Sequence, residues 1–257
     1  NLLLWISPVM HLYGFLGSVL NLGNNLTIKL IFYFPSVILS GVGTYLLVKY
    51  LKFSHSVLFF APLFYFLNTY FILLIDGGQV GVAVAYSLFP FVILVLSRFL
   101  DSISLKRFWM ALLVLMLQIV FDPRIAIISL LTLILLKPCR ALIRIVPLIM
   151  TALLLSSFWL IPLFGISTDT PSLFVSSLNL SSLLNGLFLF APHWPGNIFG
   201  KVVAPYFYFA LVPFLVFGSL IFSKTKKLFY YALLFLIFAF LPKGTTSPLG
   251  GIYHLFI

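Results

Sequence analysis

The sequence predicts an all-α, polytopic membrane protein with about eight or nine spans. Hydrophobic residues make up 63% of its 257 residues and charged residues only 7%, whereas water-soluble domains carry about 45 to 50% apolar and about 25% charged residues. The few charges lie in short clusters between long apolar runs. No soluble core could bury so much apolar surface, so we expect a multi-pass protein of the cell membrane whose residues 1–257 form a single transmembrane domain. The chain opens without Met and ends inside an apolar run, so we also expect it to be a piece of a longer protein.

Apolar runs bounded by polar or helix-breaking residues give the expected spans. They cover residues 26–50, 57–75, 80–96, 108–121, 124–136, 142–164, 205–222 and 228–241. The runs on either side of Asp122 are short for about 30 Å of hydrocarbon, so the turn between them is expected to dip below the membrane surface. Residues 2–20 contain Pro8 and two glycines, and both a span and a helix lying flat on the outer face fit them.

The positions of Lys and Arg indicate which ends of the spans face the cytoplasm, because cytoplasmic loops are rich in both residues. If the spans alternate, one side receives Lys49, Lys52, Arg98, Lys106, Arg107, Lys137, Arg140, Arg144, Lys224, Lys226 and Lys227. The other side receives only Lys29, Arg124, Lys201 and Lys243. It also holds the longest loop, residues 165–204, in which residues 172–190 are expected to form an amphipathic helix on the outer membrane surface.

Composition excludes several functions. Topology and anionic membrane lipid explain the net charge of +11, so we assign no nucleic-acid partner. The single cysteine, Cys139, rules out an internal disulfide. The chain has no phosphate-binding glycine loop, no His-Glu-x-x-His motif and no zinc-type Cys or His spacing, and glutamate is missing altogether. Any acid–base chemistry inside this chain must therefore use aspartate.

Asp76 and Asp122 are the candidate catalytic residues, since both fall in turns on the expected outer side. Asp76 begins a turn with two glycines, which let the backbone approach a ligand closely; a helix-capping role fits it equally. Asp122 and Arg124 lie two residues apart at the tip of two short helices, where Arg124 can present its guanidinium to a phosphate or diphosphate. The alternative is an ion pair that only neutralises the turn.

Two outer loops supply further substrate-binding candidates. In the first, His193, Trp194 and Lys201 combine an imidazole, an indole and an ammonium with two stiffening prolines. Such a mixture suits stacking on a sugar and holding a phosphate, although Trp and His also serve as plain interface anchors. In the second, Lys243 precedes a glycine-bearing stretch that ends in Tyr253 and His254. This second loop either closes the same substrate cavity as the first or only connects two spans.

The order of these parts resembles the multi-span GT-C glycosyltransferases, most closely the archaeal and actinobacterial arabinofuranosyltransferase-like members and the membrane proteins that glycosylate teichoic acids. The resemblance is carried by residues 8–20, 25–30, 41–49, 61–65, Asn68, Tyr70, 83–90, Arg98 and 243–253. It covers most of the chain but contains no invariant motif.

The resemblance implies transfer of a sugar from a polyprenyl-phosphate donor to a glycan or lipid acceptor on the outer face. The family's catalytic Asp or Glu lies in a first outer loop, which would precede Asn1. Asp76 then corresponds to a second acidic group, and Arg124, Lys201 or Lys243 to donor-phosphate contacts. If the transfer uses a divalent metal, Asp76 alone cannot hold it, because such ions need several oxygen ligands.

Two other functions stay open from the sequence. A transporter or flippase for an amphipathic lipid should carry ionisable groups near mid-bilayer, and such groups are nearly absent here. A non-catalytic scaffold subunit of a membrane complex is compatible with every feature above, and so is a partner membrane subunit that completes the site.

Overall fold

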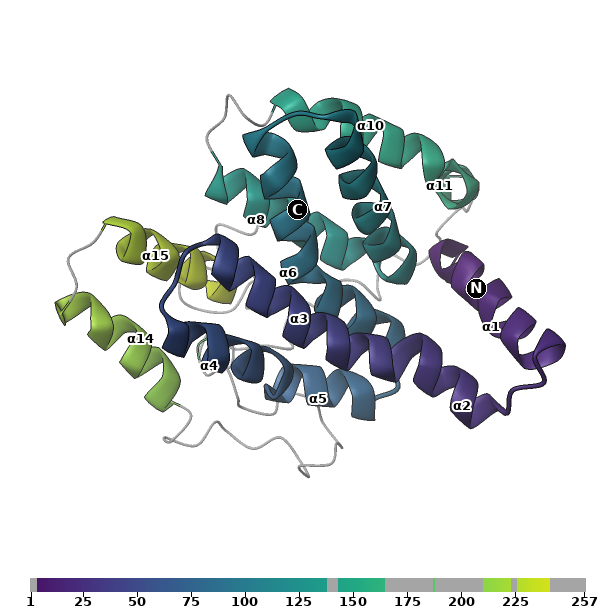
Figure 1. The fold of residues 1–257 in the computed structure, drawn as a ribbon, viewed down its shortest axis with the longest axis horizontal. Coiled ribbons are helices and arrows are strands. Elements are labelled where there is room, and N and C mark those ends of the chain that lie inside the picture. Colours follow the sequence, from purple (N-terminus) through teal and green to yellow (C-terminus); the bar gives the residue numbers. More distant parts are fainter. Residues whose placement is uncertain (1–3, 138–142, 165–186, 188–209, 223–225, 241–257) are drawn as a thin grey trace. The chain divides into compact units, whose positions relative to one another are not determined.

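In the computed structural model, residues 4–137, 143–164, 187, 210–222 and 226–240 are described, and the elements in these ranges are helices (Figure 1). The all-α prediction is confirmed for this part of the chain. Three stretches are long and apolar enough to cross a membrane: Asn24–Tyr50, His55–Asp76 and Val80–Asp101. The contacts group the chain into two compact units, Asn1–Leu67 with Leu74–Ile166 and Asn68–Leu73 with Ser167–Ile257.

The first unit contains η1 (Leu4–Ile6), α1 (Ser7–Val19), α2 (Asn24–Ile28), η2 (Lys29–Tyr33), α3 (Phe34–Tyr50), α4 (His55–Phe66), α6 (Val80–Asp101), α7 (Leu105–Phe121), α8 (Pro123–Leu136), η3 (Ile143–Ile145), α10 (Val146–Leu155) and α11 (Ser157–Phe164). Helix α5 (Thr69–Asp76) passes from the second unit into the first. The second unit also holds α14 (Leu211–Phe222) and α15 (Lys226–Phe240), where the rings of Phe217 and Phe235 meet with centroids 5.6 Å apart.

Two of the expected spans are interrupted in the structure. The run 57–75 is divided at Leu67 and Asn68 into α4 and α5, because the Asn68 side chain accepts a hydrogen bond from the Phe71 N–H at 2.9 Å and so starts a new helix. The run 142–164 is divided at Ser156 into α10 and α11. Hydrophobicity alone does not report such breaks, since apolar residues continue through both of them.

The helix that begins at Asn24 contains a π-helical segment, η2, which ends two residues before Pro35. Pro35 has no N–H to donate to the carbonyl of Ile31, and its ring crowds that carbonyl. A wider turn relieves the crowding without ending the helix. The chain therefore remains helical from Asn24 to Tyr50 despite the proline.

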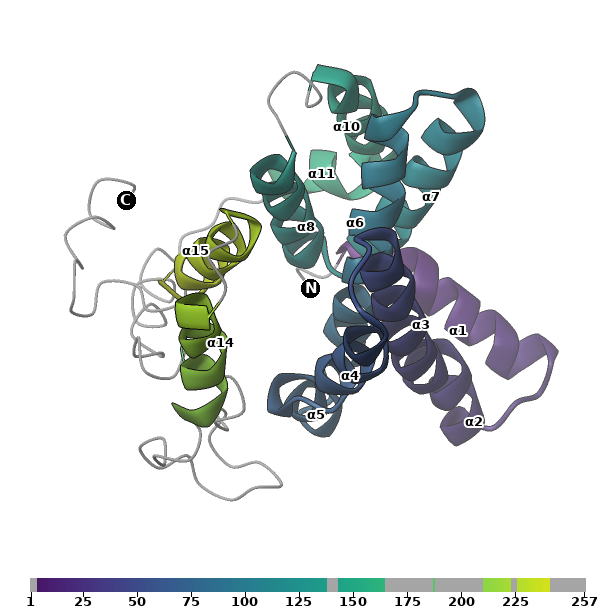
Figure 2. The ribbon, with the colours of Figure 1, turned by 60° about the vertical axis from the view of Figure 1, so that its left-hand side comes forward.

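Helix α6 is the centre of the first unit. It contacts α3, α7 and α8 (Figures 1 and 2), and most of its residues are buried. The face of α3 that packs on this bundle carries small side chains, with Ser36, Ser40 and Thr44 buried at helical spacing. Small residues let two helix backbones approach closely, which is how apolar helices gain van der Waals contact in lipid.

Helix α4 has no buried residue. Its exposed side chains include Phe59, Phe60 and Phe64. A patch of this kind is unfavourable in water but is covered at no cost by lipid tails. The arrangement is therefore that of a helix built for an apolar surrounding.

Tyr65 and Tyr86 join α4 to α6 by a reciprocal contact. Their rings are stacked with centroids 4.5 Å apart, and the Tyr65 hydroxyl donates to the carbonyl of Tyr86 at 2.8 Å. The Tyr86 hydroxyl donates to the carbonyl of Tyr65 at 3.4 Å. Pro90 explains the first of these bonds, because it has no N–H to offer the Tyr86 carbonyl four residues earlier. Tyr65 supplies the donor that the proline removes.

We expect Gly43→Val to lower the free energy of unfolding by about 1–3 kcal/mol through overpacking. A β-carbon at Gly43 would lie 3.1 Å from Cδ2 of Phe91 and 3.3 Å from Cγ of Pro90. Gly41→Val is the matched control. A β-carbon at Gly41 has no atom within 4 Å, and the substitution changes helix propensity by the same amount. Reversible unfolding in mixed micelles measures both, and equal losses would contradict the close approach of α3 to α6.

We expect Tyr65→Phe to cost about 1–3 kcal/mol of unfolding free energy, because it leaves the Tyr86 carbonyl without its hydroxyl donor. The same change in a Pro90→Ala background should cost clearly less, since residue 90 then supplies an N–H. The coupling in this double-mutant cycle is the test. Tyr45→Phe, at an exposed position, should be neutral. A cycle with no coupling would show that Tyr65 does not compensate for the proline.

Candidate functional site

Asp122 forms the whole connection between α7 and α8, as the last cap of one helix and the first cap of the other. Its side chain is only 2% exposed. Oδ1 accepts hydrogen bonds from the backbone N–H groups of Arg124 at 2.8 Å and Ile125 at 3.4 Å. The carboxylate therefore satisfies N–H groups that the start of α8 leaves unpaired.

Arg124 pairs with the same carboxylate. Its Nη2 lies 2.6 Å from Oδ2 of Asp122, and its Nε donates to Oδ1 at 3.1 Å. The arginine side chain is nevertheless 70% exposed. Asp122 thus fixes the direction of a guanidinium that remains accessible from outside the bundle. Both contacts match the ion pair that the sequence offered as the alternative, and the catalytic role of Asp122 stays a prediction.

Asp76 is exposed and ends α5, directly before a turn in which Gly78 adopts φ +69°. Only glycine takes this backbone conformation without strain. The turn leads into α6, where a β-carbon on Gly81 would lie 3.4 Å from the carbonyl oxygen of Phe121. Because Asp122 follows Phe121, the Asp76 and Asp122 turns lie at the same end of α6 and α7. The structure therefore brings three of the predicted site residues, Asp76, Asp122 and Arg124, to one end of the bundle.

The remaining predicted site residues are His193, Trp194, Lys201, Lys243, Tyr253 and His254, and they lie outside the described residues. The expected amphipathic helix over 172–190 also falls there, apart from the single residue 187. Among the residues that the structure describes, no group of three or more His, Cys, Asp or Glu side chains is placed to hold a metal ion.

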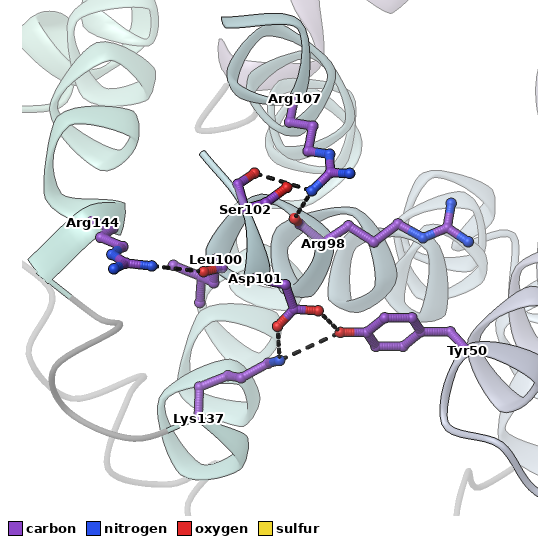
Figure 3. A network of polar contacts seen from close by, with 8 residues as sticks. All are labelled: Tyr50, Arg98, Leu100, Asp101, Ser102, Arg107, Lys137 and Arg144. Atoms are coloured by element: carbon purple, nitrogen blue, oxygen red, sulfur yellow. Dashed lines mark hydrogen bonds and ion pairs between the residues drawn. The ribbon is translucent and has the colours of Figure 1, made fainter. Parts of the chain in front are cut away.

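The opposite ends of these helices carry a polar network that joins α3, α6 and α8 (Figure 3). Asp101, at the end of α6, accepts a hydrogen bond from the Tyr50 hydroxyl and one from the Lys137 ammonium at 2.8 Å. Lys137 also donates to the Tyr50 hydroxyl at 3.4 Å. Three chain segments that are far apart in sequence are thereby tied at one end of the bundle.

Two arginines complete this end by binding backbone oxygens. Arg107 donates to the carbonyls of Arg98 and Ser102, each at 3.1 Å. Arg144 donates to the carbonyl of Leu100 at 3.1 Å (Figure 3). Arg98 and Leu100 belong to the last turn of α6, and Ser102 is its C-cap residue. The helix dipole favours cations at this end.

The pKa of the Lys137 ammonium reflects this environment. Partial burial acts to lower its pKa, but the hydrogen bond to Asp101 and the neighbouring Tyr50 raise it, and the pKa ends above its ordinary value. Lys137 is therefore protonated at neutral pH, as the ion pair requires.

Sequence reasoning assigned the basic residues to one side but did not identify Tyr50 or Asp101 as partners. Asp101 is the one acidic residue within the basic clusters between residues 49 and 144 that the sequence predicts on the cytoplasmic side. A lone carboxylate among many cations is a signal for an ion pair. The sequence does not identify the partner of Asp101, because Lys137 is 36 residues away along the chain.

No family model matches the chain, and neither the curated proteins nor the solved structures contain a match to it.

We expect Asp122→Ala to lower the free energy of unfolding by about 1–2 kcal/mol, because it removes the N-cap of α8. Asp122→Asn keeps an amide oxygen that can accept from the same N–H groups and should cost much less. Unfolding in mixed micelles measures the difference. Equal losses in the two variants would indicate that the charge pair with Arg124, rather than the cap, stabilises this turn.

Proposed function

We propose that this chain is a membrane domain of a GT-C-like glycosyltransferase, which transfers a sugar from a polyprenyl-phosphate donor to an acceptor on the outer face of a cell membrane. The observation that carries the proposal is Arg124, an exposed guanidinium held by a buried carboxylate at one end of an apolar helix bundle. A guanidinium binds phosphate in a planar, bidentate geometry. A phosphate attached to a polyprenyl chain lies where such a bundle ends.

The distribution of charge supports an outer location for this end. The network around Tyr50, Asp101 and Lys137 lies at the opposite ends of α6 and α8, and the basic residues concentrate there. Basic ends of membrane helices face the cytoplasm. The end that carries Arg124 and Asp76 then faces outward, where a lipid-linked sugar donor would be used.

The two acidic residues take different roles in this proposal. Asp76 is exposed at the end of the apolar helix α5, so its carboxylate fits contact with an acceptor or the role of a second acidic group in the site. Asp122 is buried and hydrogen-bonded on both oxygens, so it fits a positioning residue that orients Arg124. The sugar-binding roles of His193, Trp194, Lys201, Lys243, Tyr253 and His254 remain part of the same proposal.

We expect Arg124→Ala to weaken binding of a polyprenyl-phosphate sugar about tenfold or more, since a hydrogen bond to a charged group contributes about 1.5–3 kcal/mol. The measurement is photocrosslinking of polyprenyl-phosphate arabinose and polyprenyl-phosphate glucose probes to the full chain in vesicles, with competition by unlabelled donor. Transfer activity is followed in parallel.

Lys29→Ala is the matched control, because it removes one exposed positive charge without touching the Asp122 turn. It should leave crosslinking unchanged, and the amount of inserted protein should be equal in all variants. A donor that binds Arg124→Ala as tightly as the unmodified chain would remove the turn as a phosphate site. Export of the probe across the vesicle membrane without sugar transfer would favour a transporter instead.

A further inference from the structure

The basic end of the first unit holds more positive charge than its own carboxylates neutralise. The cationic residues described there are Lys49, Lys52, Arg98, Lys106, Arg107, Lys137 and Arg144. Within the described helix ends that carry these cations, Asp101 is the one carboxylate. Both of its oxygens are engaged, one by Tyr50 and one by Lys137. This end is therefore strongly positive after every internal ion pair has been counted.

Arg98 is the cation closest to this network that the Asp101 carboxylate does not pair. Its side chain is exposed, and its Cζ lies 5.9 Å from the centroid of the Tyr50 ring. Nζ of Lys137 lies at the same distance from that ring, so two cations share one tyrosine (Figure 3). Within the part of the chain that the structure describes, the Arg98 guanidinium has no hydrogen bond or ion pair. Its planar set of donors is available to an anion.

The frame around Arg98 is held independently of it. Arg107 and Arg144 bind carbonyls of the last turn of α6, and Lys137 binds Asp101. Two of the stretches long enough to cross a membrane end at this network, at Tyr50 and at Asp101. Tyrosine is typical of the depth at which lipid headgroups begin. The Arg98 guanidinium therefore lies beside the ends of two stretches that could cross a membrane, where headgroups are expected.

We propose that this end of the bundle binds the phosphate of an anionic phospholipid headgroup, with Arg98 as the main contact and the Tyr50, Asp101 and Lys137 network as its support. A phosphodiester supplies the negative charge that the network lacks, and a guanidinium forms two parallel hydrogen bonds with it. Lipid, rather than a free anion, is the ligand because the site coincides with the ends of apolar helices. The site is separate from the proposed donor site at Arg124.

The test uses the full chain in nanodiscs of phosphatidylcholine with increasing phosphatidylglycerol. Native mass spectrometry gives the relative affinity for bound phosphatidylglycerol. The unmodified chain should retain phosphatidylglycerol in preference to phosphatidylcholine. Arg98→Gln should reduce that preference about fivefold, as expected for one basic residue near an anionic surface. Arg98→Lys, which keeps the charge but loses the planar donors, should reduce it less.

Lys29→Gln is the charge-matched control, since Lys29 is exposed and lies in the stretch Asn24–Tyr50, about 30 Å along the helix from Tyr50. It should leave the preference unchanged. Inorganic phosphate added to phosphatidylcholine nanodiscs distinguishes a free anion, and binding with the same dependence on Arg98 would overturn the lipid assignment. The proposal is also overturned if the unmodified chain shows no preference, or if Lys29→Gln and Arg98→Gln lose it equally.

Discussion

The requirement that each backbone N–H and C=O find a partner inside the protein governs the described part of this structure. An apolar surrounding offers no water to satisfy these groups, so an apolar chain is restricted to helices or closed barrels. Proline interrupts this pairing within a helix, because it lacks the backbone N–H that would donate to the carbonyl four residues earlier. At Pro35 the helix widens into a π-helical turn, and at Pro90 the freed carbonyl of Tyr86 receives the Tyr65 hydroxyl. Both devices keep the helix continuous while satisfying its backbone.

Charge is divided between the two ends of the bundle in different ways. At one end, Asp122 is buried and holds an exposed Arg124. At the other, Asp101 is shared by Tyr50 and Lys137, and arginines bind the last carbonyls of α6. Asp122 caps a helix, and Asp101 connects three helices. The polar groups at the ends therefore organise the bundle, while its middle packs through small and apolar side chains.

The sequence predicts the helical class and most helix positions. Long apolar runs form helices, and the polar or helix-breaking residues between the runs mark where these helices end. The runs 80–96, 108–121 and 124–136 correspond closely to α6, α7 and α8. Hydrophobicity does not reveal the break at Asn68, since a single side-chain cap decides it. It also does not reveal which carboxylate meets which cation.

The candidate site could be predicted only in part for the same reason. Asp122 and Arg124 lie two residues apart, so their pairing is a local contact that the sequence already indicates as an alternative to phosphate binding. The approach of the Asp76 turn to the Asp122 turn depends on how α6 packs on α7 at Gly81. The pairing of Lys137 with Asp101 depends on long-range packing of α6 and α8. Spacing along a chain carries no information on contacts of that kind.

The π-helical segment at Lys29–Tyr33 has a consequence for how one long helix addresses its neighbours. An additional residue in a helical turn rotates everything that follows by about 100°. The part before the segment contacts α1 and buries Thr27, and the part after it contacts α6 and buries Ser36 and Ser40. The wide turn therefore changes which face of the helix points in a given direction. As a result, one continuous helix packs against α1 before the turn and against α6 after it.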